Sequence, residues 1–181
     1  SPMVMGISKN SNRNPNANSR KKVSEYGMQL KEKQKLKFIY GVLEKPFYHY
    51  FEIAEKMDGK AGDNLITLLE SRLDNVAYRM GMALTRREAR QLVTHRHFTV
   101  NGQRVNIPSY RVKEGDVIAL YEGSRSSQKF KDVLEQTANR PVPLWLEANK
   151  ENFSVKVTRM PKVEDLDYEV EAPLIVELYS K

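Results

Sequence analysis

Residues 85–117 decide the fold of this chain, and they read TRREARQLVTHRHFTVNGQRVNIPSYRVKEGDV. Thr85 and Glu88 have the Thr-x-x-Glu spacing of a capping box, which predicts that a helix starts here. Asn101-Gly102 then separates two short alternating runs, and this dipeptide favours a tight hairpin because both turn residues must reach positive φ. We therefore expect a helix followed directly by an antiparallel hairpin.

The predicted helix and hairpin are strongly basic. Between residues 85 and 113 the one acidic side chain is Glu88, and the basic side chains are Arg86, Arg87, Arg90, Arg96, Arg104, Arg111 and Lys113. We expect the three arginines of the helix to point away from its apolar stripe, toward solvent. Guanidinium groups pair with phosphate oxygens two at a time, so this density favours a nucleic-acid backbone as the partner. An ordinary solvated face is the alternative, and the spread of the charge over two elements counts against it.

Composition also favours an anionic partner. The chain has 181 residues, a hydrophobic content of 40%, and 30 Lys and Arg against 23 Asp and Glu. The excess positive charge is concentrated in residues 20–45 and 85–113, whereas the other segments after residue 45 are mildly acidic. The absence of cysteine excludes disulfides and thiolate metal sites and is typical of a reducing compartment. No apolar run is long enough to cross a membrane, so we expect a cytosolic protein.

The first half of the chain predicts a polar arm and several helices. Residues 1–19 are rich in Asn and Ser and predict a disordered arm. A helix is expected from a cap at Ser24 to Gly41, with Tyr26 on its inner side and its lysines facing outward. Residues 46–57 repeat apolar side chains at helical spacing, which predicts core packing rather than base stacking for their aromatic rings.

A further helical pattern precedes the basic stretch, and mixed elements follow it. The pattern begins at a cap formed by Asp63 or Asn64, and a break near Glu70 is a possible domain boundary. After the hairpin we expect strands at 117–121 and 153–157, with a helix beginning at 126 or 127 between them. Trp145 is expected to pack in a core, and the apolar segment 174–179 must also pack against another element.

Two patterns raise the question of metal binding or catalysis, and we expect neither. His95 and His97 are two residues apart, but the only other histidine is His49, so we expect no metal site and favour contact with phosphate or a base, with a local structural role as the competitor. Arg72-Leu73-Asp74 is similar to the core of pseudouridine synthases, whose aspartate is catalytic. Because this triplet lies in a helical apolar pattern, we expect Asp74 to make a local ion pair or a helix contact and the protein not to be an enzyme.

Several longer motifs together resemble the bacterial small-subunit ribosomal protein S-four family over roughly residues 20–181. They are Ser24-Glu-Tyr-Gly-Met-Gln-Leu30, Tyr40-Gly-Val42, Leu69-Glu-Ser-Arg-Leu-Asp-Asn75, Thr85-Arg-Arg-Glu-Ala-Arg-Gln-Leu-Val-Thr-His95, Val105-Asn-Ile-Pro-Ser-Tyr-Arg-Val112 and Ala172-Pro-Leu-Ile-Val-Glu-Leu-Tyr179. The resemblance implies an α+β fold, with a helical subdomain at 20–71 completed by 159–181. It also implies an inserted module at 72–158 with two helices and a small antiparallel β-sheet, which contains the S-four RNA-binding domain at about 73–121.

The resemblance also implies a function and its partners. It predicts a structural component of the small ribosomal subunit that binds small-subunit rRNA at a multi-helix junction, nucleates subunit assembly and influences translational accuracy. Neighbouring small-subunit ribosomal proteins are expected partners, and some relatives repress their own operon mRNA. We expect a cytoplasmic, ribosome-associated protein that is a monomer off the ribosome and has no cofactor, metal or membrane partner. The alternatives are a free RNA-binding translational regulator or a stalled-ribosome factor.

The positions that the resemblance and the basic pattern assign to RNA lie in two segments. They are Arg20, Lys21 and Lys22 in the arm, and Arg86, Arg87, Arg90, His95, Arg96, His97, Asn101, Arg104, Ser109, Arg111 and Lys113 in the module. Two departures allow a divergent paralogue. Relatives have a longer N-terminal region, in some cases with a cysteine zinc cluster, and they usually have Gly where this chain has Arg96. Arg in a left-handed turn costs about 1 kcal/mol relative to Gly.

Overall fold

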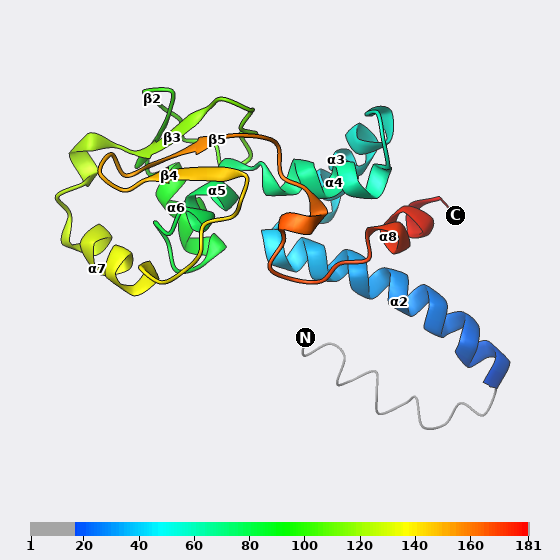
Figure 1. The fold of residues 1–181 in the computed structure, drawn as a ribbon. Helices are drawn as coiled ribbons and strands as arrows, with labels where there is room; N and C mark the ends of the chain where they lie inside the picture. The colour runs from blue at the N-terminus through cyan, green and yellow to red at the C-terminus, as the bar shows by residue number, and fades with distance from the viewer. Residues whose placement is uncertain (1–16, 181) are drawn as a thin grey trace.

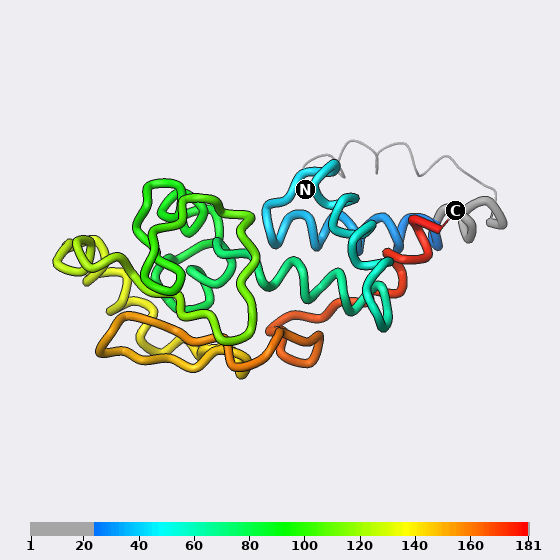
Figure 2. The backbone as a smooth tube through the Cα atoms, turned by 90° about the horizontal axis from the view of Figure 1, so that it is seen from above, coloured from blue at the N-terminus to red at the C-terminus, as the bar shows by residue number. Residues whose placement is uncertain are grey.

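The computed structural model describes residues 17–180, with side chains from residue 24 onward, and it has two lobes (Figure 1). The described chain forms seven α-helices and one five-stranded antiparallel sheet, which is an α+β fold. Seen from above, the molecule is elongated, with the sheet lobe at one end and the helical lobe at the other (Figure 2). Residues 1–16 of the predicted arm lie outside the described residues.

The helical lobe is built from both ends of the described chain. It consists of α2 (Ala17–Tyr40), α3 (Glu44–Lys56), α4 (Ala61–Glu70) and α8 (Ala172–Tyr179). Phe47, Leu65 and Leu69 are fully buried in its core, as the helical spacing of their segments predicts. The apolar closing segment forms α8, which packs against α2 and α4. The C-terminal helix therefore completes the lobe that the first helices begin.

The predicted starts of two helices are wrong. Helix α2 begins at Ala17, so Ser24 lies inside the helix and does not cap it, and residues 17–19 of the predicted arm are helical. Helix α4 begins at Ala61, with no side-chain cap at its N-terminus. Asn64 instead donates its amide to the backbone carbonyl of Ala54, 3.0 Å away near the end of α3. Asn64 was one of the two residues predicted to cap the start of α4, but it instead donates to a carbonyl at the end of α3, and sequence spacing alone does not reveal this contact.

The inner and outer faces of α2 also differ from the prediction. Tyr26 is half exposed, whereas Lys33 and Lys37 pair with Glu44 at 3.1 and 2.9 Å. Lys35 donates to the backbone carbonyl of Glu169, 2.7 Å away in the C-terminal segment. Neighbouring elements along its C-terminal half therefore engage these lysines, and they do not form a free basic face.

The sheet lobe contains the predicted basic helix and hairpin. Its elements are α5 (Leu73–Arg79), α6 (Arg86–Thr94), β1 (Phe98–Val100), β2 (Gln103–Arg104), β3 (Val117–Leu120), η1 (Glu122–Ser124), α7 (Gln128–Thr137), β4 (Leu146–Asn149) and β5 (Ser154–Val157). The strand order is β2-β1-β3-β5-β4. Phe98, Ile118 and Trp145 are fully buried beneath the sheet with the inner faces of α5 and α6, so the packing role predicted for Trp145 is confirmed.

A short link between α4 and α5 connects the lobes, and the predicted break near Glu70 is confirmed. The first N–H groups of α5 have no partner inside the helix. Here Leu73 donates to the carbonyl of Tyr110 at 2.7 Å, and Asp74 donates to the carbonyl of Pro108 at 3.2 Å. The chain returns through η2 (Val163–Asp165) to α8. That the two lobes are separate domains with the predicted boundaries stays a prediction.

Candidate nucleic-acid interface

The start of α6 follows its sequence signal. Thr85 accepts a hydrogen bond from the backbone N–H of Glu88 at 3.1 Å, which is the N-cap geometry of a capping box. The carboxylate of Glu88 reaches back to the N–H of Leu84 at 2.8 Å, one residue earlier than the motif predicts. The apolar stripe of α6 is buried, and Arg87 is exposed on the opposite side.

Arg86 and Arg90 are not the solvent-facing arginines that the helical pattern predicts. Both are half-buried where α6 meets the helical lobe. The Nε of Arg86 donates to Asn75 at 2.8 Å, and its guanidinium carbon lies 5.0 and 4.5 Å from the ring centroids of Tyr40 and Tyr78. These contacts are typical cation–π geometry. Helix α6 therefore has a second buried side, which faces the other lobe.

Arg90 bridges the two lobes. Its guanidinium donates to the backbone carbonyls of Tyr40, at 3.3 Å, and Gly41, at the end of α2. Its Nε lies 3.5 Å from the carboxylate of Asp74, which also pairs with Arg72 at 3.0 Å. Asp74 is buried and held by two arginines, so the local ion pair predicted for it is confirmed.

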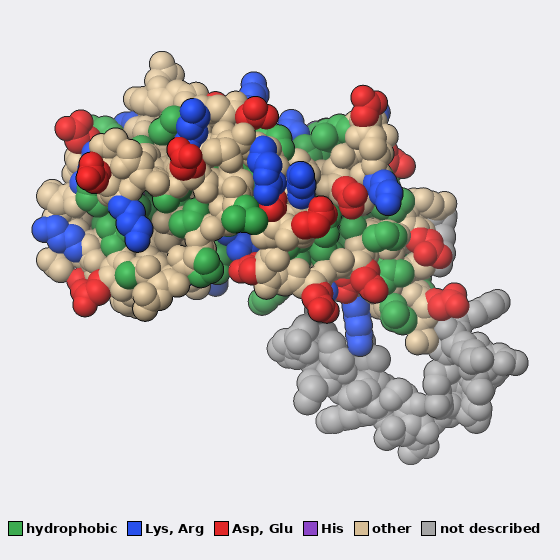
Figure 3. Space-filling model, in the orientation of Figure 1, with side chains coloured by type: hydrophobic (Ala, Val, Ile, Leu, Met, Phe, Trp, Pro, Cys, Tyr) green, Lys and Arg blue, Asp and Glu red, His purple; other side chains and the backbone are tan. Residues whose placement is uncertain are grey.

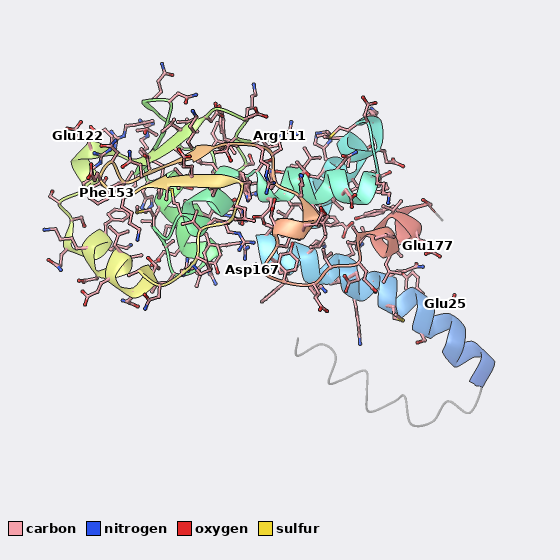
Figure 4. All side chains as sticks on the ribbon, viewed as in Figure 1. Glu25, Arg111, Glu122, Phe153, Asp167 and Glu177 are labelled. Carbon is pink, nitrogen blue, oxygen red and sulfur yellow. The ribbon has the colours of Figure 1, made fainter. Side chains whose placement is uncertain are left out.

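A larger polar network lies beside these contacts, at the joint between the lobes. The guanidinium of Arg79 donates to Glu70 at 3.0 and 3.2 Å and pairs with Asp167 at 2.9 Å. The hydroxyl of Tyr40 donates to the same Glu70 carboxylate and lies 2.7 Å from the hydroxyl of Tyr168. Burial lowers the pKa of the Arg79 guanidinium, but the charges and hydrogen bonds of Glu70 and Asp167 together outweigh it, and the net shift is upward. Figure 4 shows Asp167 at this joint.

The turn after α6 has the left-handed residue that Gly would suit, although the residue is Arg96. Its φ is 68°, its N–H donates to Val93 at 2.9 Å, and the N–H of His97 donates to Leu92 at 3.2 Å. These two bonds form a Schellman motif. The turn is therefore retained, and its side chain projects into solvent as an added positive charge.

The hairpin turn is confirmed, with φ values of 51° at Asn101 and 86° at Gly102. The side chain of Asn101 is occupied within the protein. It donates to Asp116 at 3.0 Å and accepts from the N–H of Val117 at 2.9 Å. Asn101 would have to give up these two hydrogen bonds, which hold the hairpin turn against residues 116–117, to make the predicted RNA contact with its side chain.

His97 and Arg104 lie together beside the hairpin. His97 shares a 2.7 Å hydrogen bond with Ser124. Burial lowers the pKa of its imidazole, and electrostatic interactions with His95, Lys129 and Arg104 lower it further. The guanidinium carbon of Arg104 lies 3.7 Å from the ring centroid of Tyr121. Tyr121 was not predicted as a site residue, because the sequence around a tyrosine at the end of a strand does not show which distant side chain will pack on its ring.

The remaining predicted residues lie on the segment that follows the hairpin. Ser109, Arg111 and Lys113 are exposed, and the backbone of Arg111 bridges that of Arg72. Figure 4 shows Arg111 on the side of the sheet lobe that faces the helical lobe. Arg20, Lys21 and Lys22 belong to the first turns of α2, and their side chains lie outside the described ones.

The structure thus divides the predicted basic residues into two sets. Arg87, Arg96, Arg104, Arg111 and Lys113 are exposed and form no ion pair with any side chain of residues 24–180. Arg86 and Arg90 join the lobes. On the face shown in Figure 3, acidic and basic side chains are interspersed over both lobes. Among the described residues, no cluster of His, Asp or Glu is suited to a metal ion, and no helix could span a membrane.

Comparison with known proteins identifies the family. The S4 domain matches residues 71–118, and the ribosomal protein S4/S9 N-terminal domain matches residues 3–70. Small ribosomal subunit protein uS4 of Lachnoclostridium phytofermentans is 57% identical over 181 residues, covering 99% of this chain and 91% of the relative. The chain belongs to the uS4 family. The uS4 of Clostridioides difficile is 61% identical over 162 residues, covering 90% of this chain and 78% of the relative.

The two uS4 family regions coincide with structural boundaries. The N-terminal region ends at the last residue of α4, and the S4 domain contains α5, α6 and the hairpin. The exposed, unpaired cations Arg87, Arg96, Arg104, Arg111 and Lys113 therefore all lie within the S4 domain. The resemblance seen in the sequence motifs is confirmed.

Proposed function

We propose that this chain is a structural component of the small ribosomal subunit that binds small-subunit rRNA at a multi-helix junction. As a member of a ribosomal protein family it is not an enzyme, and Asp74 is occupied by two arginines. The observation that carries the proposal is the set of exposed, unpaired cations of the S4 domain, Arg87, Arg96, Arg104, Arg111 and Lys113. We also propose, from membership of the uS4 family, that the protein nucleates subunit assembly and affects translational accuracy.

The mechanism is recognition of RNA shape by fixed cations. The major groove of an A-form helix is too deep and narrow for side chains to read, so contacts fall on phosphates, sugar hydroxyls and unpaired bases. The exposed guanidinium groups offer paired donors to phosphate oxygens. The S4 domain holds its cations on elements with an ordered core, which fixes the spacing between them.

A salt titration of RNA binding tests this proposal. The probe is a transcript of the 5′ domain of small-subunit rRNA in a filter-binding assay, and affinity should fall steeply as KCl rises. Arg87→Ala and Arg111→Ala should each weaken binding and reduce the salt slope by about 1, without changing the melting temperature. Lys56→Ala removes an exposed charge from the helical lobe and is the matched control. A flat salt response would contradict the proposal.

The proposal extends to further partners. The relatives named small ribosomal subunit protein support rRNA and neighbouring ribosomal proteins as partners, in a ribosome-associated protein of the cytoplasm. We also propose binding to its own operon mRNA, through the same cations, and a monomeric state off the ribosome. Co-sedimentation with small subunits on a sucrose gradient supports the structural role. A protein found only in the free fraction would instead be a separate translational regulator.

A further inference from the structure

The guanidinium of Arg104 is held in one orientation at the edge of the hairpin. Its carbon lies 3.7 Å from the centroid of the Tyr121 ring, the shortest cation–π distance among the described residues. Its Nε donates to the backbone carbonyl of Arg96 at 3.0 Å. One face of the guanidinium therefore covers the Tyr121 ring, and one of its donors is already used.

The ring under this guanidinium is itself fixed. The backbone N–H of Tyr121 donates to the carbonyl of His97 at 2.7 Å. Gly123 packs so closely that a Cβ there would lie 2.7 Å from Cε2 of the Tyr121 ring. The ring therefore packs against the backbone at Gly123, where a larger residue would not fit, and the stack of Tyr121 and Arg104 is present without a bound ligand. Arg104 remains exposed on its outer side, and no acidic side chain among residues 24–180 pairs with it.

The surroundings of the stack suit a nucleotide. Arg96, beside it, is exposed and held in the left-handed turn, and Lys129 is exposed on α7. Burial lowers the pKa of the His97 imidazole, and the nearby His95, Lys129 and Arg104 lower it further. Glu122, the residue after Tyr121, is also exposed, which disfavours a second phosphate next to the ring but suits the amino group of a base.

We propose that the outer face of Arg104 stacks on one unpaired base of the bound RNA, with Tyr121 as the rigid support and Arg96 on the adjoining phosphate. This inference rests on the proposed function and specifies how one part of the S4 domain meets RNA. Unpaired bases stack on aromatic rings and on guanidinium planes, and every base offers such a face. The Nε of Arg104 is already used in a hydrogen bond, and one face of its guanidinium covers the Tyr121 ring. The opposite face is therefore better placed to stack on a base than the Nε edge is to bind a phosphate.

The test compares Arg104→Lys with Arg87→Lys on the same transcript of the rRNA 5′ domain. Lysine keeps the charge but has no plane, so Arg104→Lys should weaken binding about tenfold, as expected for one stacked base, with the salt slope unchanged. Arg87 is exposed and lies over no aromatic ring among the described residues, so Arg87→Lys should change affinity by less than about threefold. Tyr121→Leu, which removes the support, should resemble Arg104→Lys.

A fluorescent base reports the stacking directly. With 2-aminopurine placed at single unpaired adenines of the transcript, wild-type protein should quench at least one position that Arg104→Lys does not. Melting temperatures confirm that each variant is folded, and Arg104→Lys suffices if Tyr121→Leu does not fold. Equal affinities of wild type and Arg104→Lys would overturn this inference. So would an Arg104→Ala variant that has a smaller salt slope than wild type but quenches the same 2-aminopurine positions, because Arg104 would then contact only phosphate. Wild-type protein that does not bind the transcript would overturn the proposed function itself.

Discussion

The buried pair of Glu70 and Arg79 predicts a large and specific loss of stability when it is broken. Their side chains are 1% and 7% exposed, and the guanidinium of Arg79 makes two hydrogen bonds to the carboxylate. Arg79→Met keeps much of the side-chain volume but leaves the Glu70 carboxylate buried with only the Tyr40 hydroxyl as a side-chain donor. Removing one member of a buried pair costs about 3–5 kcal/mol. For a chain of this size the melting temperature should fall by about 6–20 °C.

Urea denaturation followed by circular dichroism measures this loss. The midpoint should fall while the slope of the transition stays constant. The double variant Glu70→Leu and Arg79→Met leaves neither charge buried, so it should recover much of the loss. Arg111→Met makes the same substitution at an exposed position and should change stability by less than about 0.5 kcal/mol. A loss below about 1 kcal/mol for Arg79→Met, or a double variant no more stable than the single one, would refute the reasoning.

Other predictions concern the joint, the helical lobe and pH. Arg90→Ala should lower the melting temperature, because two carbonyls at the end of α2 lose their donor. An unchanged melting temperature would mean that the bridge contributes nothing. Gly62→Ala should destabilise the lobe by about 1 kcal/mol, since its Cβ would lie 2.8 Å from that of Ala172, and thermal melting checks this. Burial raises the pKa of Glu44, but hydrogen bonds from Lys37 and Lys33 bring it down to about 2 from 4.5. Its stabilising contribution is therefore complete above pH 4.5 and is lost as the pH falls toward 2. Because the carboxylate is half exposed, the contribution should stay below about 1 kcal/mol, and Glu44→Gln should flatten the acid limb of a pH–stability curve. NMR titration should give His97 a pKa below 6.5, so the folded state should lose stability as the pH falls below that value, and a pKa above 6.5 would contradict this.

Local signals predicted most of the elements around the candidate site. The capping residue Thr85, the turn at Asn101-Gly102 and the glycine that ends α2 act through their own backbone conformation, so spacing alone reveals them. The left-handed turn at Arg96 is an instructive case. The resemblance placed a Gly at this position and left open whether the turn would differ with Arg; the structure shows that the left-handed turn is kept and is closed by two backbone hydrogen bonds.

Contacts between segments distant in sequence were not predictable in the same way. Whether Arg90 faces solvent or the end of α2 depends on where the helical lobe lies, and periodicity within α6 cannot show this. The same is true of Asn64, which serves α3, and of Tyr121, whose ring is covered by Arg104. In each case the role expected from neighbouring residues is not the one found, because the side chain contacts a segment that is distant in sequence.

The division of arginines on α6 has a consequence for how RNA would be bound. Arg87 faces solvent, while Arg86 and Arg90, one and three residues away, contact Tyr40 and the end of α2 in the helical lobe. One short helix therefore fixes the orientation between the lobes and also carries an exposed cation. An RNA that contacts both lobes would meet cations at a fixed separation, and the ordering cost would already have been met in folding. If this is correct, Arg90→Ala should weaken binding of the whole rRNA 5′ domain through the joint, although Arg90 need not touch RNA. A shorter RNA hairpin bound only by the S4 domain should bind Arg90→Ala as tightly as wild type, and an equal loss with both RNAs would mean that Arg90 contacts RNA itself.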